Sequence, residues 1–156
     1  MQGSIEVKPI ALAGLAGLFS EDNRQNVFLI DQTGNAYTFF KYKAKLIDVD
    51  SLFVSVNISQ KTKEEVVEEI RKGLTYGLKA GESTVFHIGA RNEEINDLLK
   101  GEKFWEPKNL FRPPSKMDSD WYRSKLMKET DKDVFGNEGS LFPSDTYRIL
   151  ISCTYK

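Results

Sequence analysis

The sequence predicts an α/β fold with a three-layer arrangement, in which helices cover both faces of a mainly parallel sheet. Two observations carry this prediction. Short apolar runs typical of buried strands alternate with amphipathic helical segments, beginning with the run VFLI at residues 27–30. The chain then ends on a β-branched and aromatic stretch at residues 146–155. Strands separated by helices favour parallel pairing through right-handed crossovers.

The patterns place each element along the chain. Helices are expected at residues 9–19, 37–43, 62–80, 93–100 and 118–128. Strands are expected at residues 27–30, 45–49, 52–58, 84–88 and 146–155, with at least one of the second and third in the sheet. The strongest helix begins at Thr62, which forms a capping box with Glu65, and stops at Gly81. Residues 102–116, rich in proline and aromatic side chains, are expected to form a long ordered loop.

Length and composition indicate one domain over residues 1–156, with residues 1–23 as a helical lead-in and residues 102–145 as a long insertion of loop and helix. The 22 Lys and Arg residues nearly balance the 23 Asp and Glu residues, so no extended basic surface for nucleic acid or anionic lipid is expected. The longest apolar stretch, residues 9–19, is far shorter than a membrane span. A single cysteine and the lack of a signal-peptide pattern predict an intracellular protein.

The residues after the first strand occupy the position of a phosphate-binding loop in a parallel α/β sheet. Here the strand continues as Asp31, Gln32, Thr33, Gly34 and Asn35, without the lysine and following hydroxyl of a P-loop. The Asp31 carboxylate would repel phosphate rather than neutralise it. We therefore expect at most a degenerate ligand-binding site at these five residues, and no cofactor.

A second candidate site combines single residues. His87 and Cys153 are the only histidine and the only cysteine, and a thiolate–imidazole pair is conceivable if their strands are neighbours. With Asp31 and Gly34 at the strand ends, these two residues outline a crevice. The alternative function that this crevice suggests is a nucleotide- or small-ligand-binding domain, or a weak enzyme. The simpler interpretation is a buried thiol and a histidine satisfied by the backbone.

Neither a metal site nor a hydrolytic site is predicted. Asp131, Asp133 and Gly136 match three positions of an EF-hand loop, but Phe135 and Phe142 occupy two of its ligand positions. The strand at residues 84–88 is followed by glycine and alanine instead of the acidic pair that would hold magnesium and orient water. No catalytic residue is therefore assigned.

The order of these segments resembles the large α/β part of AAA+ modules, and most closely the fifth, nucleotide-degenerate module of dynein heavy chains. The similar segments are a strand and degenerate loop at residues 26–40, a helix at residues 64–77, a strand at residues 84–89 and a last segment at residues 143–156. The resemblance implies a P-loop-like sheet with a degenerate site, without the helical lid and arginine finger of a hydrolytic ring. Ser152 and Thr154 would then occupy sensor-like positions.

The resemblance also implies a non-catalytic structural or assembly protein that acts through protein–protein contacts. Its partners would be proteins of an axonemal or microtubule-associated complex, in the cytoplasm, cytoskeleton or cilium, with no nucleic acid and no membrane. Side chains of the long loop and the helix after it are the interface candidates, because aromatic anchors held by prolines are favoured at interfaces: Phe104, Trp105, Leu110, Phe111 and Trp121. The alternative is that this region closes over the protein's own core.

Overall fold

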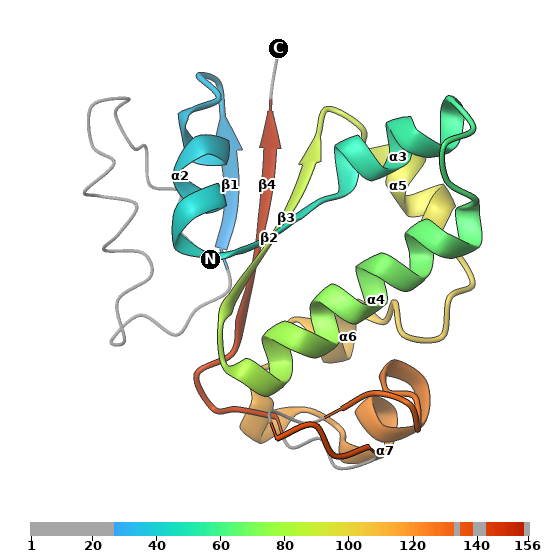
Figure 1. Ribbon diagram of the computed structural model, residues 1–156. Coiled ribbons are helices and arrows are strands. Elements are labelled where there is room, and N and C mark those ends of the chain that lie inside the picture. Colours follow the sequence, from blue (N-terminus) through green and yellow to red (C-terminus); the bar gives the residue numbers. More distant parts are fainter. Residues whose placement is uncertain (1–26, 133–134, 139–142, 155–156) are drawn as a thin grey trace.

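The computed structural model describes residues 27–132, 135–138 and 143–154 and contains a four-stranded, all-parallel sheet with helices on both faces (Figure 1). The predicted three-layer α/β fold is confirmed. The helix expected at residues 9–19 and the lead-in at residues 1–23 lie outside the described residues. The strands, in the spatial order β1-β4-β3-β2, are β1 (Val27–Asp31), β2 (Lys45–Asp48), β3 (Ser83–Gly89) and β4 (Arg148–Thr154).

The helices divide unequally between the two faces of the sheet (Figure 1). One face carries α2 (Asn35–Lys43), which connects the two outer strands β1 and β2. The other face carries α3 (Val49–Asn57), α4 (Lys63–Ala80) and α5 (Asn92–Leu99). The long connection from β3 to β4 continues on that second side through α6 (Pro107–Leu110), a 3-10 turn (Pro114–Lys116), α7 (Ser119–Trp121) and a π-helical turn (Tyr122–Leu126).

Two hydrophobic cores follow from this arrangement. The smaller core packs Ala36 and Phe40 of α2 against Val85 of β3 and Leu150 of β4. The larger core lies between the sheet and the remaining helices and contains Phe86. Because successive side chains of a strand point to opposite faces, the neighbours Val85 and Phe86 enter different cores. This explains why the central strand β3 is apolar on both sides.

Residues 52–58 form most of α3, so the strand expected there is wrong. Asp48 is the N-cap of this helix, and its carboxylate accepts hydrogen bonds from the Ser51 backbone N–H at 3.0 Å and the Ser51 hydroxyl at 2.8 Å. Leu52 and Val56, four residues apart on one helix face, pack against the larger core. A short apolar run does not by itself distinguish a strand from a buried helix. The cap and the core together select the helix.

The ends of α4 are those that the sequence predicts. The Thr62 hydroxyl accepts a hydrogen bond from the Glu65 backbone N–H at 3.2 Å, and the Glu65 carboxylate accepts one from the Thr62 N–H at 2.8 Å. Gly81 ends the helix with a φ of 70°, a left-handed conformation that glycine adopts without strain. The capping box and the stop are both confirmed.

Two interior glycines let α4 approach the sheet closely. A Cβ atom on Gly73 would lie 2.6 Å from the Cδ1 atom of Ile47 in β2. A Cβ atom on Gly77 would overlap the hydroxyl of Thr84 in β3 and lie 3.2 Å from its Cβ. Glycine lowers helix stability by about 1 kcal/mol relative to alanine, so its presence at both positions reflects this contact with the sheet.

Arg71 joins α4 to the loop that follows the π-helical turn. Its side chain is 4% exposed and donates hydrogen bonds of 2.7 to 2.9 Å to Glu68, Asp131 and the Leu126 carbonyl. Glu68 also pairs with Lys128 at 2.6 Å. The hydrogen bonds from Arg71 are the main reason that the pKa of Glu68 falls to about 2. Removing one partner of a buried ion pair costs roughly 3–5 kcal/mol, so this network holds the loop on α4.

Gly77→Ala is expected to lower the free energy of unfolding by about 1–3 kcal/mol, the usual cost of overpacking. The loss would occur although alanine is the better helix former, because the new methyl group meets Thr84. Urea denaturation followed by circular dichroism measures the change. Lys72→Ala, on the exposed side of the same helix, is the control and should be nearly neutral. A Gly77→Ala protein as stable as wild type would contradict the close packing.

Candidate functional site

The carboxyl edge of the sheet, where parallel α/β proteins place their ligands, begins at Asp31. One oxygen of this carboxylate accepts hydrogen bonds from the Thr33 backbone N–H at 2.9 Å and the Thr33 hydroxyl at 2.8 Å. The other oxygen accepts the Ala36 backbone N–H at 2.9 Å, in the first turn of α2. Gly34, with a φ of 79°, provides the left-handed residue that turns the chain back onto its own strand end. The side chains of Gln32 and Asn35 are exposed.

This arrangement places a carboxylate at the N-terminus of α2. Partial burial raises the pKa of Asp31, but the hydrogen bonds from Thr33, Ala36 and Gly34 outweigh it, and the pKa lies below its ordinary value. The N-terminus of a helix is a general site for anions, because its backbone N–H groups have no partner within the helix. Here an ionised side chain of the protein itself takes that place.

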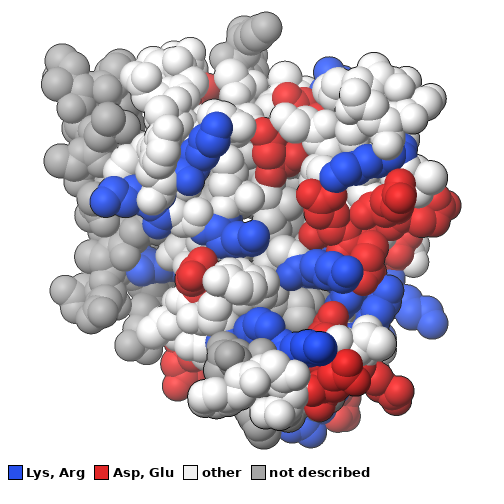
Figure 2. Space-filling model, viewed as in Figure 1, with Lys and Arg blue, Asp and Glu red and all other residues white. Residues whose placement is uncertain are grey.

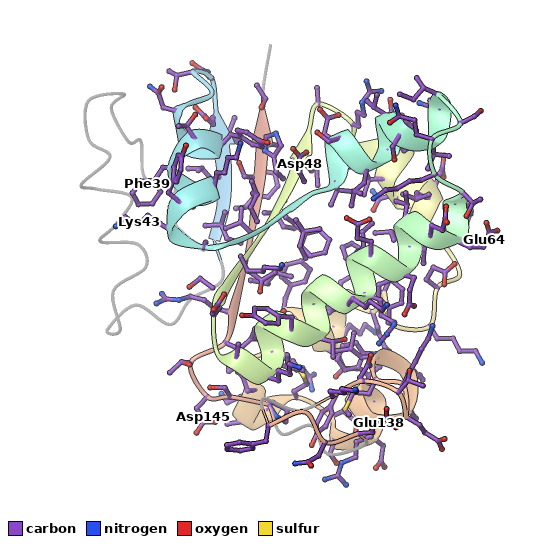
Figure 3. All side chains as sticks on the ribbon, in the orientation of Figure 1. Phe39, Lys43, Asp48, Glu64, Glu138 and Asp145 are labelled. Carbon is purple, nitrogen blue, oxygen red and sulfur yellow. The ribbon has the colours of Figure 1, made fainter. Side chains whose placement is uncertain are left out.

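A polar cluster that includes residues missed by the sequence reasoning connects α2 to three strands. The Tyr37 hydroxyl donates to Asp48 at 2.8 Å, and the Tyr37 ring lies against His87 with 4.8 Å between ring centroids. His87 Nδ1 lies 3.5 Å from the Ser152 hydroxyl of β4. The hydrogen bond to Asp48 is the main reason that the pKa of Tyr37 is raised. Asp48, labelled at the end of β2 in Figure 3, thus serves both this cluster and the cap of α3.

Burial limits what this cluster can do chemically. His87 is 9% exposed and Ser152 is 1% exposed, so the serine hydroxyl does not face solvent. The 3.5 Å separation is also longer than the usual hydrogen bond between a nucleophile and its base. The cluster therefore serves to hold α2 against the sheet. The sequence singles out His87 and Ser152 for other reasons, and the signal for the remaining members is Asp48, a carboxylate near the end of a predicted strand.

The thiolate–imidazole pair considered from the sequence is not formed. β3 and β4 are neighbours, as that hypothesis required, but His87 lies opposite Ser152 and Cys153 lies opposite Gly89. Consecutive residues of β4 point to opposite faces, so the Cys153 side chain packs against the larger core while Ser152 faces α2. The Cys153 thiol donates to the Leu29 carbonyl at 3.5 Å, and burial raises its pKa.

The expected interface residues are mostly core residues. Phe104, Leu110 and Trp121 are buried in the larger core at 3%, 1% and 2% exposure, so the expectation that they are exposed anchors is wrong. Trp105 and Phe111 are partly buried and pack against the same core. The alternative interpretation, a loop that closes over its own core, describes these five side chains. An interface role stays a prediction for the exposed parts of Trp105 and Phe111 alone.

A groove of about 760 Å³ opens on the opposite side of β2 from α2. It is bounded by all four residues of β2, by one side of α4, by the first turns of α3 and by residues 130–132. In Figure 2 basic side chains lie over the middle of this view, while acidic side chains gather towards the side where α4 begins. Tyr76 of α4 lines the groove and is 42% exposed.

The EF-hand-like match carries no metal site in the part of the chain that is described. Asp131 is held by Arg71, and Asp133 lies outside the described residues. Within the described ranges, no group of three His, Cys, Asp or Glu side chains is arranged to hold a metal ion. None of the described helices combines the length and the apolar character needed to cross a bilayer.

Comparison with known proteins returned no match to a protein-family model, to a curated protein or to a solved structure.

Asp31→Ala is expected to lower the free energy of unfolding at neutral pH by about 1 kcal/mol, because the Ala36 N–H in the first turn of α2 loses its carboxylate acceptor, as when a helix loses an N-cap side chain. Because the folded-state pKa is lowered, the carboxylate contributes fully above the unfolded value of about 3.9, and its contribution is lost as the pH falls through the folded value. Urea denaturation near neutral pH and in acid should therefore give a smaller difference between Asp31→Ala and wild type in acid. Asp97→Ala, an exposed carboxylate, is the control. A difference that grows in acid would refute this role.

Proposed function

We propose that this protein is a non-catalytic structural or assembly domain with a degenerate AAA+-like core, and that it acts through protein–protein contacts. The observation that carries the proposal is the Asp31 carboxylate at the N-terminus of α2. A nucleotide phosphate would need those backbone N–H groups, and it would meet a negative charge already bound to them. The parallel sheet and the loop between β1 and α2 agree with the resemblance to the nucleotide-degenerate dynein module.

Exposed apolar side chains on β1 support a role in protein contacts. Phe28 is 61% exposed and Ile30 is 56% exposed, whereas Leu29 between them packs against the smaller core. Phe28 and Ile30 therefore point to the other face, and at this edge of the sheet the described helices leave them uncovered. In the described part of the chain β1 pairs with β4 alone. Exposed apolar residues on an outer strand are a common feature of protein-binding edges.

The proposed setting is an axonemal or other microtubule-associated complex, in a cilium or the cytoskeleton. This part of the proposal depends only on the resemblance to a dynein module. Sedimentation of the purified protein with axonemal extract, compared with the extract-free control, tests it directly.

Calorimetric titration with ATP and with ADP, each with magnesium, tests the degenerate site. Wild type is expected to give no saturable heat, because Asp31 occupies the helix N-terminus that a phosphate would use. Asp31→Ala is titrated in parallel, since it removes the competing charge. Saturable one-to-one binding by wild type would contradict the proposal and restore the nucleotide-binding alternative.

Replacing Phe28 and Ile30 together by serine is expected to leave the fold stable to within about 0.5 kcal/mol, as is usual for exposed positions. The same change should reduce the recovery of partner proteins in affinity capture from cells, because it removes the apolar surface of β1. Tyr42→Ser is the matched control, since Tyr42 is an exposed aromatic residue on α2. Equal recovery by the double variant and the control would exclude β1 from the interface.

A further inference from the structure

We infer that the groove along β2 binds an extended acidic peptide segment of a partner protein, which adds as a strand to the free edge of β2. This inference rests on the proposed role in protein contacts and names the chemistry of one partner. It concerns the strand edge opposite β1, where the groove and its lysines lie.

The shape of the groove fits an extended chain. All four residues of β2 line it, and in the described part of the chain β2 pairs only with β3. The outer edge of such a strand presents N–H and C=O groups in the spacing that a further strand requires. On the other side of the groove, α4 lies close to β2 because Gly73 allows contact with Ile47. Residues 130–132 close one end, and the Arg71 network holds them there.

The charge of the groove fits an acidic segment. Three carboxylates line it, and each already has partners within the protein. Asp48 accepts hydrogen bonds from Tyr37 and Ser51. Glu69 pairs with Lys61, and Asp131 pairs with Arg71. The basic side chains outnumber them and are Lys45, Lys61, Lys72, Lys79 and Lys132. No carboxylate of the described residues lies within ion-pair distance of Lys45 or Lys72.

Tyr76 holds two of these lysines at the groove. The Lys45 ammonium lies 5.1 Å from the centre of the Tyr76 ring, and the Lys79 ammonium lies 6.0 Å from it. Such cation–π contacts restrain a flexible lysine without neutralising its charge. The Lys79 ammonium also donates a hydrogen bond to the Lys132 carbonyl. The Lys45 ammonium is therefore the one that Tyr76 restrains while it can still pair with a carboxylate of the peptide.

The spacing of the lysines favours a peptide over a single phosphate group. Lys45 lies on β2 and Lys72 lies on α4, so the two lysines come from different walls of the groove. Alternate residues of a strand point to one side at about 6.6 Å intervals, so carboxylates spread along an extended chain can reach both lysines. A phosphate site instead gathers backbone N–H groups at a helix N-terminus or in a glycine-rich loop. Among the described residues that line this groove, the helix start is that of α3, where the Asp48 carboxylate already accepts the Ser51 N–H.

Fluorescence anisotropy with three labelled peptides tests the inference. The first alternates glutamate with valine and threonine, the second has lysine in place of each glutamate, and the third keeps the glutamates but has proline between them. Wild type should bind the first peptide and not the second, because of charge. It should bind the third at least about tenfold more weakly, because proline cannot donate the hydrogen bonds of an added strand.

A double variant, Lys45→Glu with Lys72→Glu, should weaken binding of the first peptide by at least about tenfold. The matched control is Lys100→Glu with Lys103→Glu, the same charge change at exposed lysines outside the groove, and it should bind like wild type. Hydrogen exchange should slow at the amides of residues 45–48 when the peptide is bound. Circular dichroism of each variant checks that the fold is retained.

Several results would overturn the inference. The first is no binding of the first peptide by wild type. The second is an equal loss of peptide affinity in the groove variant and in the control variant. The third is unchanged hydrogen exchange at the β2 amides when the peptide is present. If the proline peptide bound as tightly as the first peptide, strand addition would be excluded. If a short oligonucleotide of equal charge displaced the first peptide, the groove would be a general anion site. Nucleotide binding at the α2 N-terminus would overturn the proposed function instead. The calorimetric titration detects that binding, and a change in nucleotide affinity on Asp31→Ala places it at α2 and not in the groove.

Discussion

The close approach of α4 to the sheet is the constraint on which most of this structure depends. Gly73 and Gly77 remove the side chains that would keep the helix away from β2 and β3. Arg71, on the same helix, is buried where the loop at residues 126–131 meets α4, and its partners there are Glu68 and Asp131. The glycine contact thus positions α4 over the larger core and beside the groove, and the Arg71 network on the same helix holds the loop that closes one end of that groove.

The carboxyl edge of the sheet shows a helix N-terminus satisfied from within the chain. In an anion-binding protein the N–H groups at that position are left for the ligand. Here the Asp31 carboxylate accepts the Ala36 N–H of α2, and the Asp48 carboxylate accepts the Ser51 N–H at the start of α3. Tyr37, His87 and Ser152 link these strand ends through contacts that are buried or partly buried. The polar groups of this edge are thus used to hold α2, β2, β3 and β4 together.

The two outer strands of the sheet carry different chemistry. β1 presents apolar side chains, whereas β2 lies beside a groove with an excess of lysine. The order β1-β4-β3-β2 separates these strands by the full width of the sheet, although they are consecutive in the chain. Under the proposed function and the inferred peptide site, such a domain would contact two partners at once, one by apolar burial and one by charge and strand pairing.

The sequence by itself determined the elements whose signals are local. Hydrophobic periodicity and a capping box place α4, Gly81 ends it, and apolar runs place β1, β3 and β4, because these signals act between residues close in the chain. The alternation of elements also predicted the parallel sheet. These features do not require knowledge of what packs against each segment.

Only the tertiary structure decided the rest, because it depends on contacts between distant residues. The run at residues 52–58 is ambiguous until Asp48 caps it as a helix. The aromatic side chains of the long loop are exposed or buried according to whether the loop folds back on the sheet, and Trp121 is buried. His87 and Cys153 lie on neighbouring strands but on opposite faces, which strand register alone settles. The groove exists only because strand order leaves β2 at an edge and α4 lies beside it.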